Sequence, residues 1–118
     1  MPQLQSLGTV STPYGEARIV IGRYPKGGAI AVQVLLGDDP DDGWTLSTNL
    51  VSYGARVAND EFTVKSWSEN EPLIEPMLAT GLFEDTGRRC PSGFVEAPVW
   101  RVKDPGHVPP VPAGVAHA

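Results

Sequence analysis

Few residues of this chain belong to the types that most often carry out catalysis. The two histidines, His107 and His117, both lie near the C-terminus, and the single cysteine is Cys90. Histidine is the usual general base and the commonest metal ligand. One cysteine and two terminal histidines also fall short of the four ligands of a structural zinc site. The sequence therefore predicts a protein that is not an enzyme and that needs neither a metal ion nor a cofactor.

Cys90 is a nucleophile whose neighbours could increase its reactivity. It follows Arg88 and Arg89, and nearby cations favour the reactive thiolate form of a cysteine. Nucleophilic catalysis also needs an activating base, and the sequence places none beside it. We expect an ordinary loop cysteine. A small enzyme with a carboxylate- or Cys90-based site between a sheet and a helix stays open as the alternative.

Acidic residues gather in the middle of the chain, which has a net charge of −5. The cluster fails the calcium-loop pattern, because Pro40 stands at the third position counted from Asp38 and Asn49 at the twelfth. Acidic surfaces repel phosphate backbones and suit a basic groove on a protein. The candidate partner-binding residues are therefore Asp38, Asp39, Asp41, Asp42, Asp60 and Glu61. A solvated turn is the simpler interpretation of the four aspartates, since turns often carry Asp.

Two apolar segments, 17–24 and 29–36, are rich in β-branched residues and flank the turn sequence at 25–28, so they predict a β-hairpin. Alternating polar and apolar residues at 44–51 and 61–67 predict two more strands. A fifth is expected over 94–102, where Pro98 favours a sheet edge or a late strand start.

Evidence for a helix is confined to one segment. Polar and acidic residues at 68–72 suit a helix N-terminus, apolar residues follow at helical spacing, and Gly81 is a natural stop. The fold expected is α+β, a four- to five-stranded mainly antiparallel sheet with one short helix packed on it. Residues 83–93 are expected to form a polar loop.

One domain accounts for the length of 118 residues, because two domains of half that size would each be marginally stable. We expect an irregular lead-in segment over 1–12, in which Leu7 and Val10 could begin a strand, a single α+β domain over 13–103 and a disordered, flexible Pro-rich tail over 104–118. No apolar run approaches the roughly 20 residues of a membrane span, and the N-terminus does not resemble a signal peptide. With a single cysteine, a reducing compartment and hence the cytoplasm are expected.

Short motifs along residues 17–102 give a resemblance to a known family. They are the segment Leu46-Ser47-Thr48-Asn49-Leu50, then Ser68-Glu69-Asn70 before a short helix ending at Gly81, then Ser92-Gly93-Phe94 and Pro98-Val99-Trp100. Their order resembles a small domain family of unknown function carried on bacterial plasmids, integrative elements and phages. The acidic segment and the long tail are not part of that pattern.

The resemblance implies an accessory protein of a mobile element, a group that includes anti-defence factors such as anti-CRISPR proteins. The function expected is a non-catalytic protein-binding module, an inhibitor whose acidic surface engages a protein partner such as a host nucleic-acid-binding complex. Direct nucleic-acid binding is not expected as the main activity, because the middle of the chain is acidic. A structural homo-oligomeric accessory protein that pairs exposed strand edges is a further alternative.

Overall fold

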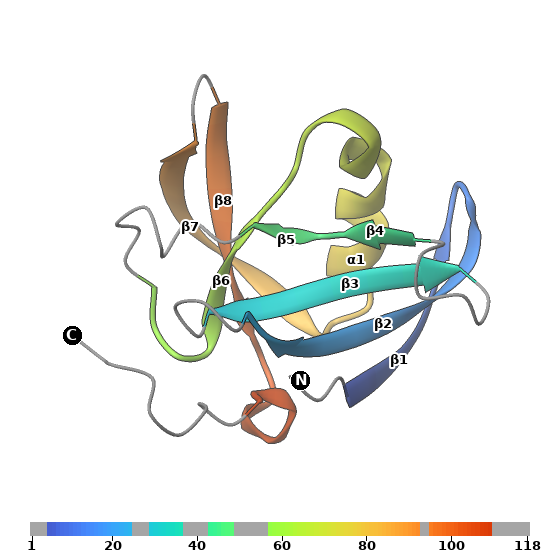
Figure 1. Cartoon of the computed structure of the whole chain (residues 1–118), viewed down its shortest axis with the longest axis horizontal. Coiled ribbons are helices and arrows are strands. Elements are labelled where there is room, and N and C mark those ends of the chain that lie inside the picture. Colours follow the sequence, from blue (N-terminus) through green and yellow to red (C-terminus); the bar gives the residue numbers. More distant parts are fainter. Residues whose placement is uncertain (1–4, 25–28, 37–42, 49–56, 93–94, 110–118) are drawn as a thin grey trace.

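The computed structural model of the chain describes residues 5–24, 29–36, 43–48, 57–92 and 95–109. It contains two antiparallel sheets of four strands each and one short α-helix (Figure 1), which is the predicted α+β class. In the first sheet the order is β1-β2-β3-β4, with β1 Gln5–Thr12, β2 Gly15–Arg23, β3 Ile30–Leu36 and β4 Gly43–Thr45. In the second it is β5-β6-β8-β7, with β5 Ser47–Thr48, β6 Glu61–Val64, β7 Phe83–Ser92 and β8 Val95–Val102.

The predicted hairpin is confirmed, since β2 and β3 pair antiparallel from Ala17 opposite Leu36 to Arg23 opposite Ile30. The strand expected over 61–67 is confirmed in its first half as β6. The strand expected over 44–51 is found as two short strands, β4 and β5, and its residues 49–51 lie outside the described part of the chain. The strands therefore form two sheets where one was expected.

Leu46 is the residue at which the chain passes from one sheet to the other. Its N–H donates to the carbonyl of Val32 in β3 over 2.8 Å, and its own carbonyl accepts the N–H of Lys65, just beyond β6, over 2.7 Å. The side chain is fully buried. A single residue thus joins the first sheet to the second, and the two sheets wrap around one core.

Polar side chains reinforce this junction. The Ser47 hydroxyl accepts the N–H of Val32 over 2.8 Å and lies 2.9 Å from the Tyr24 hydroxyl. Asn70 is buried, and its side-chain amide donates to the carbonyls of Thr45 and Lys65 over 2.8 and 3.0 Å. Both sets of bonds satisfy backbone groups that the change of sheet would otherwise leave buried without a partner.

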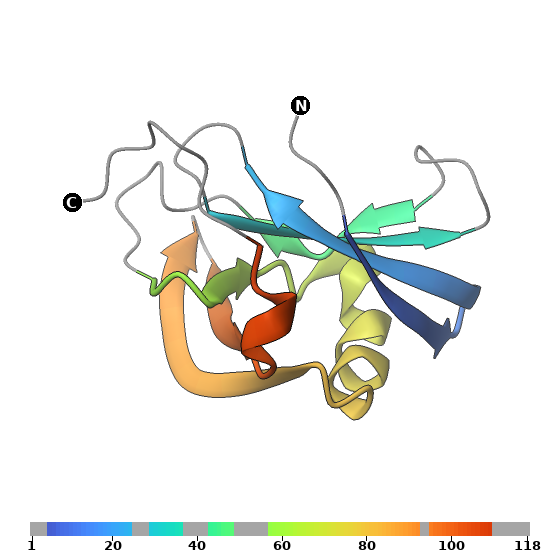
Figure 2. The same cartoon turned by 90° about the horizontal axis from the view of Figure 1, so that it is seen from below.

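The core lies between the sheets and is closed by the helical segment. A 3-10 helix, η2 Ser68–Leu73, leads into α1 Ile74–Ala79. Gly81 follows with a φ of 78°, as the predicted stop requires. The helix contacts β1 and β7, and Figure 2 shows it between these two strands. Leu73 and Met77 are fully buried. Packing against two strands, more than capping, explains why so short a helix is stable.

Three aromatic rings fill the centre of the second sheet's inner face. Phe62 meets Phe83 and Trp100 edge to face, with ring centroids 5.4 and 6.2 Å apart. The remaining buried cluster is aliphatic and comes from both sheets and the helical segment, namely Val10, Ala17, Ile19, Ile21, Ile30, Val32, Val34, Leu46, Val64, Leu73, Met77 and Val102. Trp100 is fully buried at the centre of this cluster.

Two segments expected to be irregular are strands, so those predictions are wrong. Residues 5–12 of the expected lead-in form β1, and most of the expected loop at 83–93 forms β7. Both strands lie at sheet edges, and much of each is exposed to solvent. Polar residues are therefore tolerated on both faces, and the alternation that marks a half-buried strand is missing.

The other corrections concern β8 and the C-terminal segment. Pro98 lies in β8, an interior strand, although it sits just beyond Val99, the last residue paired with β6. The expected disordered tail does not begin at residue 104, because η3 Pro105–His107 and a buried Pro109 continue the fold. The rest of that tail, from residue 110, lies outside the described residues.

Truncating the junction residue is expected to destabilise the whole domain. Leu46→Ala removes a fully buried side chain where both sheets meet, so the free energy of unfolding should fall by about 2–5 kcal/mol. Urea denaturation measures this change, with Glu75→Ala on the exposed face of α1 as the control. A surface substitution of this kind should shift stability by less than about 0.5 kcal/mol. Equal effects of the two variants would contradict the role given to Leu46.

Tyr24 should make stability depend on alkaline pH. Burial raises the pKa of this phenol, while its bond to Ser47 acts in the opposite direction. The unfolded chain then loses the Tyr24 proton at a lower pH than the native state, so stability falls as pH rises past about 10, the ordinary tyrosine pKa. Tyr24→Phe should cost about 1 kcal/mol at neutral pH. The difference in unfolding free energy between wild type and Tyr24→Phe, measured by urea denaturation, should shrink above about pH 10. A difference that stays constant with pH would contradict a raised pKa of Tyr24.

Candidate interaction surface

A row of alternating charges crosses three strands of the second sheet. In the strand register, Arg101 of β8 stands between Glu84 of β7 and Glu61 of β6. The flanking residues Trp100 and Val102 point into the core, so the row lies on the opposite face of the sheet. Arg101 forms an ion pair with Glu84. The register itself therefore brings opposite charges together on this face.

A β-bulge in β7 adds a second arginine to the row. The register shifts between Asp85 and Arg89, and Gly87 within the shift has a φ of 85°. Such a backbone conformation favours glycine and is common in bulges. Asp85 accepts the N–H of Gly87 over 2.9 Å. The Thr86 hydroxyl donates to the Val99 carbonyl over 2.8 Å, which ties the bulge to β8. Figure 2 shows β7 bending sharply along its length.

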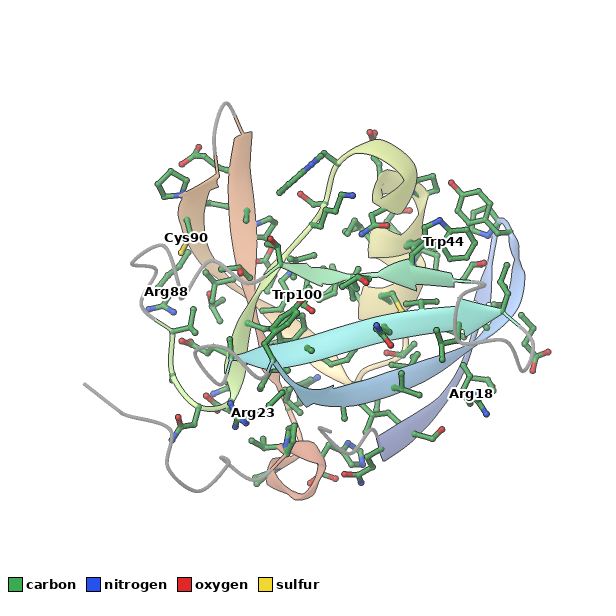
Figure 3. The ribbon with its side chains drawn as sticks, in the orientation of Figure 1. Arg18, Arg23, Trp44, Arg88, Cys90 and Trp100 are labelled. Atoms are coloured by element: carbon green, nitrogen blue, oxygen red, sulfur yellow. The ribbon has the colours of Figure 1, made fainter. Side chains whose placement is uncertain are left out.

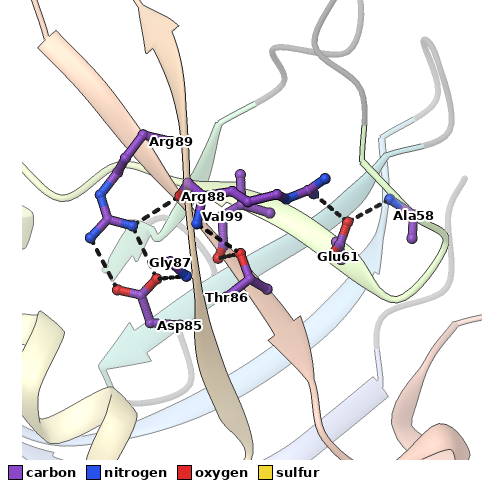
Figure 4. Close-up of polar contacts among 8 residues, drawn as sticks. All are labelled: Ala58, Glu61, Asp85, Thr86, Gly87, Arg88, Arg89 and Val99. Carbon is purple, nitrogen blue, oxygen red and sulfur yellow. Dashed lines mark hydrogen bonds and ion pairs between the residues drawn. The ribbon is translucent and has the colours of Figure 1, made fainter.

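Arg88 leaves the bulge and reaches across to β6 (Figure 4). Its guanidinium donates to a carboxylate oxygen of Glu61 over 2.5 Å, and the same oxygen accepts the N–H of Ala58 over 2.8 Å. The Glu61 side chain is only 14% exposed, whereas the Arg88 side chain is 52% exposed. The pair therefore fixes the arginine at the surface by means of a mostly covered carboxylate.

Arg89 is fixed in a similar way at the strand edge. Its guanidinium contacts both carboxylate oxygens of Asp85, at 3.1 and 3.4 Å, and donates to the Arg88 carbonyl over 2.9 Å. Asp85 thus orders the bulge through Gly87 and the arginine through its carboxylate. Asp85 therefore fixes both the shape of β7 at the bulge and the direction of the Arg89 side chain.

We define the charged face as Glu61, Glu84, Arg88 and Arg101 on the outer side of the second sheet, together with the Asp85–Arg89 pair at the edge of β7. Three carboxylates and three guanidinium groups give it no net charge. The three arginine side chains are nevertheless 41–52% exposed. The charged face therefore presents fixed, accessible guanidinium groups without a net positive field, an arrangement suited to contact with another protein.

Of the six predicted acidic site residues, only Asp60 and Glu61 belong to the described part of the chain. Asp38, Asp39, Asp41 and Asp42 lie outside the described residues. Asp60 and Glu61 are adjacent at the start of β6, where the Asp60 carbonyl accepts the N–H of Val102 over 2.8 Å. Glu61 is paired with Arg88, so it contributes no isolated negative charge. Partner binding by all six acidic residues stays a prediction.

Cys90 lies in β7 opposite Ala97 and is half-buried (Figure 3). Its neighbours Arg88 and Arg89 direct their guanidinium groups to Glu61 and Asp85. Within the described ranges, histidine, cysteine and acidic residues form no group of three or more suited to a metal ion.

Arg23 is a buried charged residue that sequence reasoning missed. Its guanidinium donates to the Pro109 carbonyl over 3.2 and 2.9 Å and to the Asn59 carbonyl over 2.8 Å. The residue is 5% exposed, and burial lowers its pKa. Figure 3 shows it near the end of β2. Strand alternation could have indicated its burial. Ala17, Ile19 and Ile21 lie on the core side of β2, and Arg23 is the next odd-numbered residue of this strand.

No protein-family model, no curated protein and no solved structure matches this chain. In the part of the chain that the structure describes, no helix combines the length and the apolar character needed to cross a membrane.

The bulge should depend on the conformational freedom of one glycine. Gly87→Ala places a side chain at a φ of 85°. The left-handed region is unfavourable for alanine, so the free energy of unfolding should fall by about 1–2 kcal/mol. Urea denaturation tests this, with Glu96→Ala in the exposed part of β8 as the control from the same hairpin. An unchanged stability of Gly87→Ala would mean that the bulge does not need glycine.

Proposed function

We propose that this chain is a non-catalytic protein-binding module and that the charged face is its binding surface. The observation that carries the proposal is the set of three exposed arginines held in place by carboxylates and by the shape of β7. Arginine is enriched at protein interfaces and among the residues that dominate their binding energy.

Fixed side chains favour binding for a physical reason. Ordering a long side chain at an interface costs roughly 0.5–1.5 kcal/mol, and a side chain ordered beforehand avoids much of that cost. Arg88 and Arg89 each bond a carboxylate, and Arg89 also bonds a backbone carbonyl. Donors beyond those already in use are available on each guanidinium, which has five N–H groups. A partner that offers carboxylates or carbonyls at matching positions fits this face.

The resemblance to a family of mobile-element proteins gives the module a biological role in this proposal. It acts as an inhibitor that occupies a surface of a host defence complex, in the manner of anti-CRISPR proteins. The acidic residues at 38–42, with Asp60, then engage a basic groove of that complex, while the neighbouring Glu61 holds Arg88 in place. The charged face supplies a second set of contacts, in which opposite charges fix the orientation of the partner.

The test is affinity capture from nuclease-treated bacterial lysate, followed by mass spectrometry and titration of the recovered protein. Arg88→Ala with Arg89→Ala should weaken binding roughly thirtyfold or more, as loss of central interface arginines does. Arg18→Ala, an exposed arginine of the first sheet, is the matched control and should bind normally. Changing the four aspartates at 38–42 to asparagine should weaken binding and flatten its dependence on salt.

Each outcome decides one part of the proposal. Failure to recover any stoichiometric protein overturns the binding module. Full affinity of the double arginine variant overturns the charged face as the binding surface. Full affinity of the asparagine variant overturns the acidic mechanism.

A further inference from the structure

The two edge strands β1 and β7 differ in whether their residues block pairing with a further strand. In β1, all eight residues are uncharged, none is proline, and six are glycine, serine, threonine or glutamine. Among the described residues, β1 has a strand partner only in β2. Alternate residues of an edge strand direct their N–H and C=O groups away from the sheet. Such an edge is a template for another strand.

The edge strand β7 of the second sheet shows the usual protection against that event. It contains the bulge at 86–88, the exposed Pro91, and the charges of the Asp85 and Arg89 ion pair. Each of these features blocks regular pairing at an edge. The strand β1 also has a register shift, between Ser6 and Gly8, but its residues 8–12 carry no charge and no proline, which points to this part of β1 as the side where a strand is added.

We propose that β1 pairs antiparallel with β1 of a second copy, so that the first sheets of two chains form one continuous sheet. A two-fold axis perpendicular to the sheet makes the contact self-complementary, as in most homodimers. The absence of charge on β1 matters here, because a symmetric pairing would bring any charge near its own copy. In this arrangement the added strand is identical to the edge that receives it.

Charges on the neighbouring strand select the register. Thr9 lies opposite Arg18 and Ser11 lies opposite Glu16 in the β1–β2 ladder. All four residues are exposed. If Val10 lies opposite Val10 of the second copy, Thr9 of each chain lies opposite Ser11 of the other. The line of paired residues across the four strands then has Arg18 of one chain at one end and Glu16 of the other chain at the other end. Shifting the axis to Thr9 or Ser11 puts two arginines or two glutamates in one row.

The Val10-centred register also suits the shape of the strand. It pairs residues 8–12 of each chain and leaves the bulge between Ser6 and Gly8 outside the new ladder. On the core side, Val10 retains 7% exposure and Leu7 is half-buried against the same core. Val10 is buried in the core, so the contact consists mainly of backbone hydrogen bonds.

Two charge variants test the pairing and its register. Thr9→Glu with Ser11→Glu places carboxylates against each other across the axis, so the dimer should be lost. Thr9→Glu with Ser11→Lys places opposite charges in contact and should preserve it. The second variant also matches Arg18 and Glu16 within the chain, so both substitutions suit the folded monomer. Circular dichroism melting checks that each variant is folded.

Sedimentation equilibrium of the full chain over a wide concentration range is the measurement. The wild type should rise from the 12.6 kDa of one chain towards twice that mass. The double-glutamate variant should stay at 12.6 kDa at every concentration. A wild type that remains a single chain up to about 1 mM, the weak limit of specific association, overturns the proposal. A double-glutamate variant that still dimerises overturns the β1 contact, and loss of the dimer in the glutamate–lysine variant overturns the register.

The inference is independent of the proposed function. The β1 edge belongs to the first sheet and the charged face to the second. A monomeric wild type would leave the capture experiment unaffected, and an intact dimer says nothing about the double arginine variant.

Discussion

The structure depends on the single residue at which one strand leaves the first sheet and the next enters the second. Leu46 bonds Val32 through its N–H and Lys65 through its carbonyl, so both of its backbone groups are satisfied although they belong to different ladders. Gly43 allows the approach to β3, because a Cβ there would lie 2.3 Å from the Val34 carbonyl oxygen. Buried backbone groups must find partners, and this one arrangement satisfies them while both sheets share a core.

In the second sheet, strand β7 bends sharply (Figure 2). The arrangement of the charged face follows from this bend. A bulge lengthens and bends a strand relative to its partner. In β7 Thr86, Gly87 and Arg88 lie opposite the single residue Val99 of β8, so the feature that bends the strand also directs Arg88 across β8 to Glu61. Shape and charge arrangement on this face therefore have one origin.

Much of the fold could be predicted from local pattern. The hairpin of β2 and β3, the strand β6 and the helix stop at Gly81 follow from β-branched runs, alternation and glycine. The junction at Leu46 could not be predicted, because 44–50 alternates without interruption and indicates one strand. For β7 the pattern contains no signal, and for β1 only Leu7 and Val10 indicate a strand, since edge strands can be polar on both faces. The pairing of Glu61 with Arg88 depends on residues 27 positions apart, which no local pattern contains.

The bond from Arg23 to Pro109 has a consequence for how the chain folds during synthesis. It spans 86 positions, so the contacts at the end of β2 cannot be completed until Pro109 has left the ribosome. Contacts between residues so distant in sequence slow folding, because the entropy of closing a long loop is lost before the contact forms. The β2–β3 hairpin therefore lacks this contact until Pro109 has been synthesised. Apolar surface exposed during such an interval favours aggregation.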